Sequence, residues 1–163
     1  GGAVIARSLD DGGARWSTDL LGAERAAAGE GVIAVQASNA AVWVLDPADG
    51  TQLWRSQHSG VGRELLVADG VVVSQSDEGT VAWGVDSDGE KLWTSAATEK
   101  LLAGDGRFVL ATTSGLEVRE PDGEVVGEVE LGEVGLGVTR VILDAPRGIR
   151  VLQSNTTGME VRR

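Results

Sequence analysis

The hydrophobic and polar positions of this chain repeat as a strand, a tight turn and a second strand. The pattern is clearest in residues 41–54, AVWVLDPADGTQLW, where an apolar run meets a turn rich in Asp, Pro and Gly, and a second run ends in Trp54. It recurs in residues 81–93, VAWGVDSDGEKLW, and in weaker form in residues 4–16 and 115–127. Because the same strand pattern recurs along the chain, we predict a repeat protein built from β-sheets.

The interval between the repeats predicts the architecture. Trp16, Trp54 and Trp93 follow one another after 38 and 39 residues. Similar intervals separate the turn glycines of the four copies, Gly13, Gly50, Gly89 and Gly123. Periods near 40 residues with four short strands per unit are typical of β-propeller blades. Helical repeats need long runs with a 3.6-residue period, and the 24 glycines interrupt such runs. We therefore expect an all-β propeller of four-stranded antiparallel blades.

Turn signals divide the chain into repeat units within one domain, residues 1–163. The expected units are residues 3–18, 24–56, 63–95, 99–131 and 137–163. Asp69-Gly70 and Asp105-Gly106 each lie between two apolar runs, which is a strong hairpin signal. The alanine-rich residues 24–28 are expected to form a strand, because the glycines on either side leave no room for a helix.

The order of the expected strands leaves the closure of the ring open. The first unit supplies only the last two strands of a blade, and the final unit supplies only the first three. One solution is a closed four-bladed ring in which the two ends share a blade. The other is an arc, such as half of an eight-bladed ring, completed by a second copy in a homodimer or by a missing piece. An arc leaves unpaired backbone at its ends.

Composition excludes several classes of partner. Lys and Arg number 14 against 25 Asp and Glu, so the formal net charge is −11, which disfavours nucleic acid and anionic lipid. No run of 18 apolar residues is present, so we expect no membrane insertion. The chain has no Cys, and its start lacks the pattern of a signal peptide. An abundance of Ala, Val and Gly, with more Arg than Lys, indicates a bacterial source.

The units resemble the quinoprotein-like (PQQ-like) β-propeller repeat. Its pattern is an apolar strand, then Leu-Asp-x-x-x-Gly, then Trp four residues later. Residues 45–54 match it in full, residues 85–93 match it with a turn one residue shorter, and residues 9–16 match it with the segment between the Gly and the Trp one residue shorter. In residues 115–127, Glu120 replaces the Asp and Gly127 replaces the Trp. The resemblance implies that a tryptophan of each blade docks on the next blade.

By this resemblance, a set of structural docking residues can be named. They are Trp16, Trp54, Trp93, Asp46, Asp86, Gly50 and Gly89. Physical chemistry agrees, because a Trp buries up to about 250 Å² and its ring N–H requires a hydrogen-bond acceptor. The glycines are expected to supply the positive φ that a short hairpin turn needs.

The sequence contains few residues that could support catalysis or bind a metal ion. Quinone-dependent dehydrogenases of the family depend on a complete ring, calcium, a Cys pair and a catalytic Asp, so we expect neither enzyme activity nor a cofactor. Asp46 and Asp49 resemble calcium ligands, but a calcium loop is much longer, and an Asx turn is the favoured interpretation. His58 is the single histidine and is expected to be a solvated loop residue.

Trp43 and Trp83 occupy equivalent positions, three residues before the turn Asp. This equivalence favours a place in the core. The alternative is a ligand or partner surface formed by Trp43, Trp83 and His58.

The function expected from these observations is a non-enzymatic scaffold that binds an unknown protein partner. The resemblance includes an outer-membrane assembly scaffold, which implies an extracellular or cell-envelope setting. The alternatives are a propeller that binds a carbohydrate or small ligand, and a degenerate fragment of a quinoprotein dehydrogenase.

Overall fold

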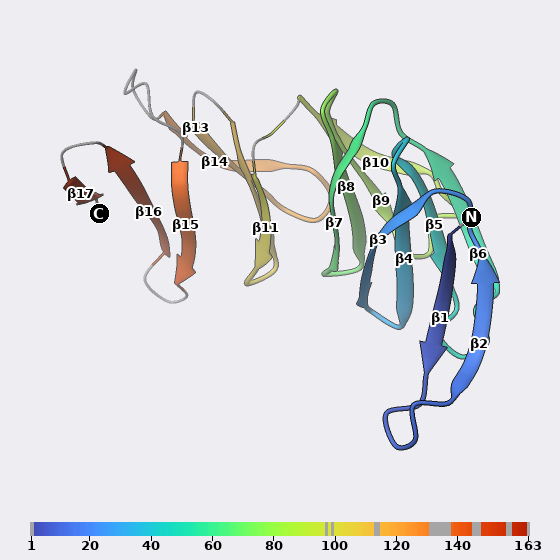
Figure 1. The fold of residues 1–163 in the computed structure, drawn as a ribbon. Helices are drawn as coiled ribbons and strands as arrows, with labels where there is room; N and C mark the ends of the chain where they lie inside the picture. The colour runs from blue at the N-terminus through green and yellow to red at the C-terminus, as the bar shows by residue number, and fades with distance from the viewer. Residues whose placement is uncertain are drawn as a thin grey trace.

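The computed structural model describes residues 2–96, 98, 100–112, 115–130, 138–144, 148–155 and 158–162. These residues form strands β1 to β17 and contain no helix. The strands make five antiparallel sheets, which follow one another in chain order along an arc (Figure 1). The predicted all-β class and the four-stranded antiparallel sheets are thereby confirmed.

Three complete sheets occupy the middle of the arc. Sheet 2 contains β3 (Ala23–Gly29), β4 (Val32–Ala37), β5 (Ala41–Leu45) and β6 (Gln52–Gln57). Sheet 3 contains β7 (Gly62–Ala68), β8 (Val71–Ser76), β9 (Thr80–Gly84) and β10 (Lys91–Ser95). Sheet 4 contains β11 (Lys100–Gly104), β12 (Arg107–Ala111), β13 (Gly115–Arg119) and β14 (Val125–Glu130).

Two incomplete sheets stand at the ends of the arc. Sheet 1 contains β1 (Ala3–Arg7) and β2 (Ala14–Asp19), and sheet 5 contains β15 (Val138–Asp144), β16 (Gly148–Asn155) and β17 (Gly158–Arg162). Among the described strands, no pairing joins sheet 1 to sheet 5. Figure 1 places them at opposite ends of the arc. In the part of the chain that the structure describes, the arc therefore matches the open alternative, without the shared blade of a closed four-bladed ring.

Each inner sheet is buried on both faces, which explains its continuous apolar runs. In β4, Val32 and Ala34 pack toward sheet 3, while Val35 and Ala37 pack toward sheet 1. In β8, Val72 packs toward sheet 2 and the valines beside it toward sheet 4. A strand between two neighbours has no solvent face, so the alternation of apolar and polar residues is lost.

The first two strands of each complete sheet are joined by a two-residue turn with positive φ at both positions. The pairs are Glu30-Gly31, Asp69-Gly70 and Asp105-Gly106, with φ of 51° and 74°, 51° and 75°, and 55° and 73°. This is the type I′ pattern, whose twist matches that of the flanking strands. The first residue of the turn is Asp in sheets 3 and 4, whereas in sheet 2 it is Glu30.

Trp16, Trp54 and Trp93 each donate the indole N–H to a main-chain carbonyl of the next sheet. Each of these tryptophans lies four residues after a turn glycine. The pairs are Trp16 Nε1 to Pro47 O (2.9 Å), Trp54 Nε1 to Val85 O (2.7 Å) and Trp93 Nε1 to Pro121 O (3.0 Å). The acceptors lie in the docking turns, a name we give to the turn between the last two strands of sheets 1 to 4. These turns are residues 8–13, 46–51, 85–90 and 120–124.

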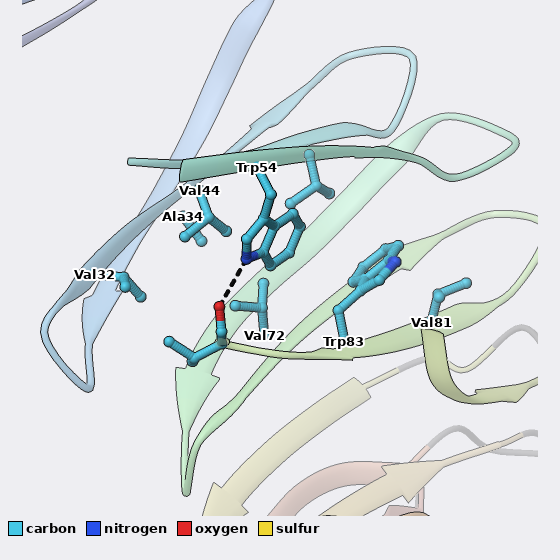
Figure 2. Packing of buried hydrophobic residues seen from close by; sticks show 9 residues of the cluster. Val32, Ala34, Val44, Trp54, Val72, Val81 and Trp83 are labelled. Atoms are coloured by element: carbon cyan, nitrogen blue, oxygen red, sulfur yellow. Dashed lines mark hydrogen bonds between the residues drawn. The ribbon is translucent and has the colours of Figure 1, made fainter. Parts of the chain in front are cut away.

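A glycine with positive φ makes room for the indole in these turns. A Cβ added to Gly50 would lie 2.4 Å from the Trp16 ring, and one added to Gly123 would lie 2.6 Å from Trp93. At Gly89 the nearest atom of Trp54 would be 3.5 Å away. Trp54 also belongs to the apolar cluster between sheets 2 and 3, where its ring centroid lies 6.2 Å from that of Trp83 (Figure 2).

Sheet 1 has the same docking turn, with one correction to the expected residue. Gly12 has φ of 70° and precedes Trp16 by four residues, as Gly50 precedes Trp54, whereas Gly13 does not have positive φ. The strand register also shifts just before this turn, between Ala6 and Arg7, as it does before the turns of sheets 2 and 4. Because Gly12 and Gly13 are adjacent, the sequence alone did not show which of them takes the left-handed conformation.

Glu30→Asn should stabilise the first type I′ turn. A left-handed conformation costs most L-residues roughly 1–2 kcal/mol, and Asn tolerates it best after Gly. We expect the free energy of unfolding in urea to rise by up to about 1 kcal/mol. Glu90→Asn makes the same change of charge in an exposed turn without positive φ, and it should give no such gain. An equal effect of the two variants would contradict this explanation.

Trp54→Ala should lower the free energy of unfolding by about 3–5 kcal/mol, because it removes a buried ring and leaves the carbonyl of Val85 without its donor. The matched control is Leu53→Ala, one residue earlier on the same strand, where the side chain is 49% exposed. That variant should cost less than about 1 kcal/mol. Urea unfolding followed by far-UV circular dichroism gives both values.

Candidate functional site

Trp43, Trp83 and His58, the alternative ligand or partner surface, are all buried, and the two tryptophans take the core position that their equivalence favoured. Trp83 is fully buried, while Trp43 is 8% and His58 5% exposed. Each Trp faces the preceding sheet, and the guanidinium of Arg55 covers Trp43 at 5.2 Å from the ring centroid. An aromatic platform for a sugar would need exposed rings.

His58 is not the solvated loop residue that its polar surroundings predicted. Its backbone N–H donates to Ala40 O at 3.3 Å, and its ring lies edge-on to Trp83 at 6.3 Å between centroids. The loop between β6 and β7 must cross from one sheet to the next, and this crossing places the side chain over the seam between sheets 2 and 3. Its burial depends on a neighbouring sheet, which local sequence does not reveal.

His58 and Ser76 lie together in a way that superficially resembles a catalytic pair. Nε2 of His58 is 3.5 Å from Ser76 Oγ, at the limit of a hydrogen bond. However, Ser76 Oγ already accepts from the N–H groups of Glu78 and Gly79, and no partner orients His58 Nδ1. Both side chains are buried, so a substrate has no access to them. The pair organises the turn between β8 and β9.

Two buried glutamines make contacts that we did not predict, Gln36 from sheet 2 to sheet 3 and Gln75 from sheet 3 to the connection between β10 and β11. Gln36 Nε2 donates to Ser74 Oγ at 2.7 Å and to Gln75 O at 3.0 Å. Gln75 Nε2 donates to Thr98 Oγ1 at 2.7 Å and also contacts Thr98 O. The sequence did contain a signal for these contacts, because β4 (VIAVQA) and β8 (VVVSQS) both have Gln at their fifth position. A polar residue repeated inside an apolar strand indicates a contact between repeats.

The buried polar cluster at this end of the strands retains unpartnered atoms. Within the described part of the chain, these are Gln36 Oε1, His58 Nδ1 and Trp83 Nε1. A buried polar atom without a partner costs free energy, and an internal water satisfies such atoms where there is room. The cluster is closed to solvent, so its role is structural.

The opposite ends of the strands carry an acidic rim. In an antiparallel sheet of four strands, the first turn and the third turn lie on the same side, and Figure 1 shows these turns along the lower side of the arc. The turns of sheets 1 to 4 on this rim contain no Lys or Arg. Their acidic residues, exposed or half-buried, are Asp10, Asp11, Glu30, Asp46, Asp49, Asp69, Asp86, Asp88, Glu90, Asp105, Glu120, Asp122 and Glu124.

The carboxylates of the first motif are directed into their own turn. Asp46 Oδ1 accepts from Ala48 N at 2.7 Å, and Asp49 Oδ1 accepts from Thr51 N at 2.9 Å. These are Asx turns. Hydrogen bonds from Thr51 lower the pKa of Asp49 below its ordinary value. In the described residues, no three His, Asp or Glu side chains converge closely enough to hold a metal ion. The same residues contain no helix capable of spanning a membrane.

The buried histidine should make stability depend on pH. Burial lowers the pKa of His58 below its ordinary 6.5, with a smaller effect of Lys91 in the same direction and of Glu78 in the opposite direction. Below pH 6.5 the unfolded chain binds a proton that the folded chain does not, so the free energy of unfolding falls until the folded His58 also titrates.

His58→Gln should therefore lose stability less steeply than the native chain as the pH is lowered from 7 to 5. Urea titrations at several pH values measure the slope. Asp11 and Asp49, whose pKa values lie below 3.8, contribute only at lower pH. Identical slopes for the two proteins would contradict this role of His58.

Comparison with known proteins identifies the repeat. A family model described as outer membrane protein assembly factor BamB matches residues 1–148. No curated protein matches the chain.

Solved structures show the same fold at low identity. The computationally designed Ika8 protein is similar with a TM-score of 0.74 and 16% identity, over 96% of this chain and 51% of that one. BamB from Moraxella catarrhalis has a TM-score of 0.69 and 11% identity, over 98% of this chain and 62% of that one. The designed Ika4 protein has a TM-score of 0.62 and 19% identity, over 84% and 88%.

The chain thus spans about half the length of Ika8 and three fifths that of BamB. The family match covers most of the sequence, and the sheets and their tryptophan contacts repeat in the same order. The protein therefore belongs to the BamB-type family of quinoprotein-like β-propellers.

Proposed function

We propose that the protein is a non-enzymatic scaffold that binds another protein in an exported or cell-envelope setting. The family match to an outer membrane assembly factor supports this setting. The observation that carries the proposal is the contrast between the two ends of the strands. The polar cluster at one end is sealed, while the acidic rim at the other end is exposed on a rigid frame.

The rim is suited to recognise a basic protein surface. Its turns are held by Asx hydrogen bonds, type I′ geometry and docked indoles, so the carboxylates keep their spacing. With a formal net charge of −11, the protein attracts a positively charged partner over the Debye length, and salt weakens that attraction. A binding surface on loops held by rigid sheets is typical of this kind of fold.

A carbohydrate-binding role lacks the surface it would need. Four of the five tryptophans, Trp43, Trp54, Trp83 and Trp93, are buried, and the fifth, Trp16, is half-buried against sheet 2. A protein partner is the class of ligand that the exposed surface favours.

Site-specific photo-crosslinking in the cells that produce the protein tests the proposal. A benzoylphenylalanine residue at Glu90 or Glu124 on the acidic rim should form a discrete adduct with one or a few proteins. The same residue at Asn39, on the opposite rim, should not. Adducts from Asn39 alone, or no discrete adduct from any position, would contradict binding at the acidic rim.

A charge variant that preserves the turns provides the matched control. Asp69→Asn and Asp105→Asn keep the Asn-Gly form that type I′ turns accept, yet each removes one negative charge. The double variant should reduce the adduct yield severalfold without changing the circular dichroism spectrum. An unchanged yield would show that the charges of the rim do not select the partner.

A further inference from the structure

The last strands of the sheets form the outer edge of the arc. β7 contacts the first strands of the sheets on either side, β3 and β11, so the first strands lie on the inner side of the arc. β6, β10 and β14 lie at the other edge of their sheets, and each pairs with one strand only. The outer edge of each complete sheet is therefore accessible to a partner.

Each of these edge strands contains a β-bulge at the same place. In sheet 2 the register passes from Gln52 to Trp54, so Leu53 has no partner residue on β5. The registers of sheets 3 and 4 omit Leu92 and Val126 in the same way. A bulge takes the extra residue out of the alternation of the strand and redirects its side chain. In all three sheets the redirected side chain is apolar.

The bulged side chains are exposed to solvent. Leu53 is 49%, Leu92 46% and Val126 44% exposed. With Val125, they are the exposed large apolar side chains among those that the structure describes in the strands of sheets 2 to 4. The bulge does not require an apolar residue, because the corresponding residue of sheet 1 is Arg15, which is also exposed. We call Leu53, Leu92 and Val126 the outer apolar row.

An exposed carboxylate precedes each member of the outer apolar row by four residues, on the docking turn that leads into the bulged strand. These residues are Asp49, Asp88 and Asp122. Asp49 Oδ1 accepts from Thr51 N at 2.9 Å, and Asp122 Oδ1 accepts from Glu124 N at 3.0 Å. These hydrogen bonds hold two of the three carboxylates in place. The sheets therefore repeat a unit of one acidic and one apolar side chain.

Few cations offset the charge of this edge. The last strands of sheets 2 to 4 contribute Arg55 and Lys91, and Arg55 covers the ring of Trp43 at 5.2 Å from its centroid. The docking turns contain no Lys or Arg. The negative charge repels anionic lipid and attracts a protein segment that carries Lys or Arg. Repeated acidic and apolar positions thus match a segment with both basic and apolar side chains.

We propose that the outer apolar row binds the apolar side chains of a basic protein segment, whose Lys or Arg side chains contact the carboxylates of the docking turns. The inference rests on the proposed function, because it names the chemistry of the partner and the part of the rim that it contacts. The bulges interrupt the regular backbone edge of each last strand. The segment therefore binds through its side chains and does not add a strand to a sheet.

Two fluorescent peptides test this chemistry. The first probe alternates Lys and Leu, and the second alternates Lys and Ser with the same length and charge. Fluorescence anisotropy should show that the native chain binds the Lys-Leu peptide at least about fivefold more tightly, because its leucines lose contact with water on the outer apolar row. Equal affinities for the two peptides would contradict the proposal.

Variants of the row show whether it is the surface that binds the peptide. Leu53→Ser, Leu92→Ser and Val126→Ser together should remove most of the preference for the Lys-Leu peptide and leave the affinity for the Lys-Ser peptide unchanged. The control variant carries Leu21→Ser and Val61→Ser, at side chains that are 82% and 57% exposed near the opposite ends of the strands. An undiminished preference in the row variant, or an equal loss in the control, would overturn the proposal.

Sedimentation with lipid vesicles separates a protein segment from a membrane surface. The native chain should stay in solution with vesicles of phosphatidylcholine and with vesicles that also contain phosphatidylglycerol. Binding to either kind of vesicle that the three Ser substitutions abolish would assign the outer apolar row to a lipid surface and refute the protein occupant.

Crosslinking in cells distinguishes this inference from the proposed function. A benzoylphenylalanine residue at Glu90 reports whether the acidic rim has a protein partner, and the three Ser substitutions should reduce its adduct yield severalfold. An adduct of unchanged yield would mean that the rim binds its partner without the outer apolar row, which overturns the inference alone. Peptide results as expected, with no adduct in cells, would support the row and contradict the proposed partner.

Discussion

The burial of both faces of every inner sheet is the constraint on which this structure depends. A single four-stranded sheet with two apolar faces cannot be stable in water, so each sheet requires a neighbour on either side. At the three seams between sheets 1 and 4, one tryptophan from the preceding sheet and apolar side chains of the following sheet fill the space between them. The arrangement resembles a one-dimensional stack, in which each unit is stabilised by its nearest neighbours.

Most of the fold could be predicted because its signals are local. Apolar runs, Asp-Gly turns and the interval between Trp16, Trp54 and Trp93 are properties of short segments that act the same way in each repeat. The alanine-rich segment before Gly29 was placed correctly as a strand because its glycines excluded a helix. The choice between Gly12 and Gly13 failed because both residues accept a left-handed conformation, and only the packed turn decides between them.

The site was less predictable because burial depends on the neighbouring sheet. His58 lies in a polar segment, and nothing in that segment indicates that the crossing to the next sheet encloses it. The glutamines of β4 and β8 carried a usable signal, since a polar residue at the same place in two apolar strands requires a partner from another repeat. Their partners, however, are main-chain and hydroxyl groups 38 and 39 residues away for Gln36 and 23 residues away for Gln75, which no local pattern identifies.

The identity of the atoms that accept the docked indoles has a consequence for the family. Pro47, Val85 and Pro121 contribute only their carbonyl oxygens to these hydrogen bonds. Every residue type has such an oxygen, so the hydrogen bond itself does not depend on which side chain the acceptor residue carries. The docking contact can therefore persist while the sequence changes, and BamB from Moraxella catarrhalis keeps the same fold at 11% identity to this chain.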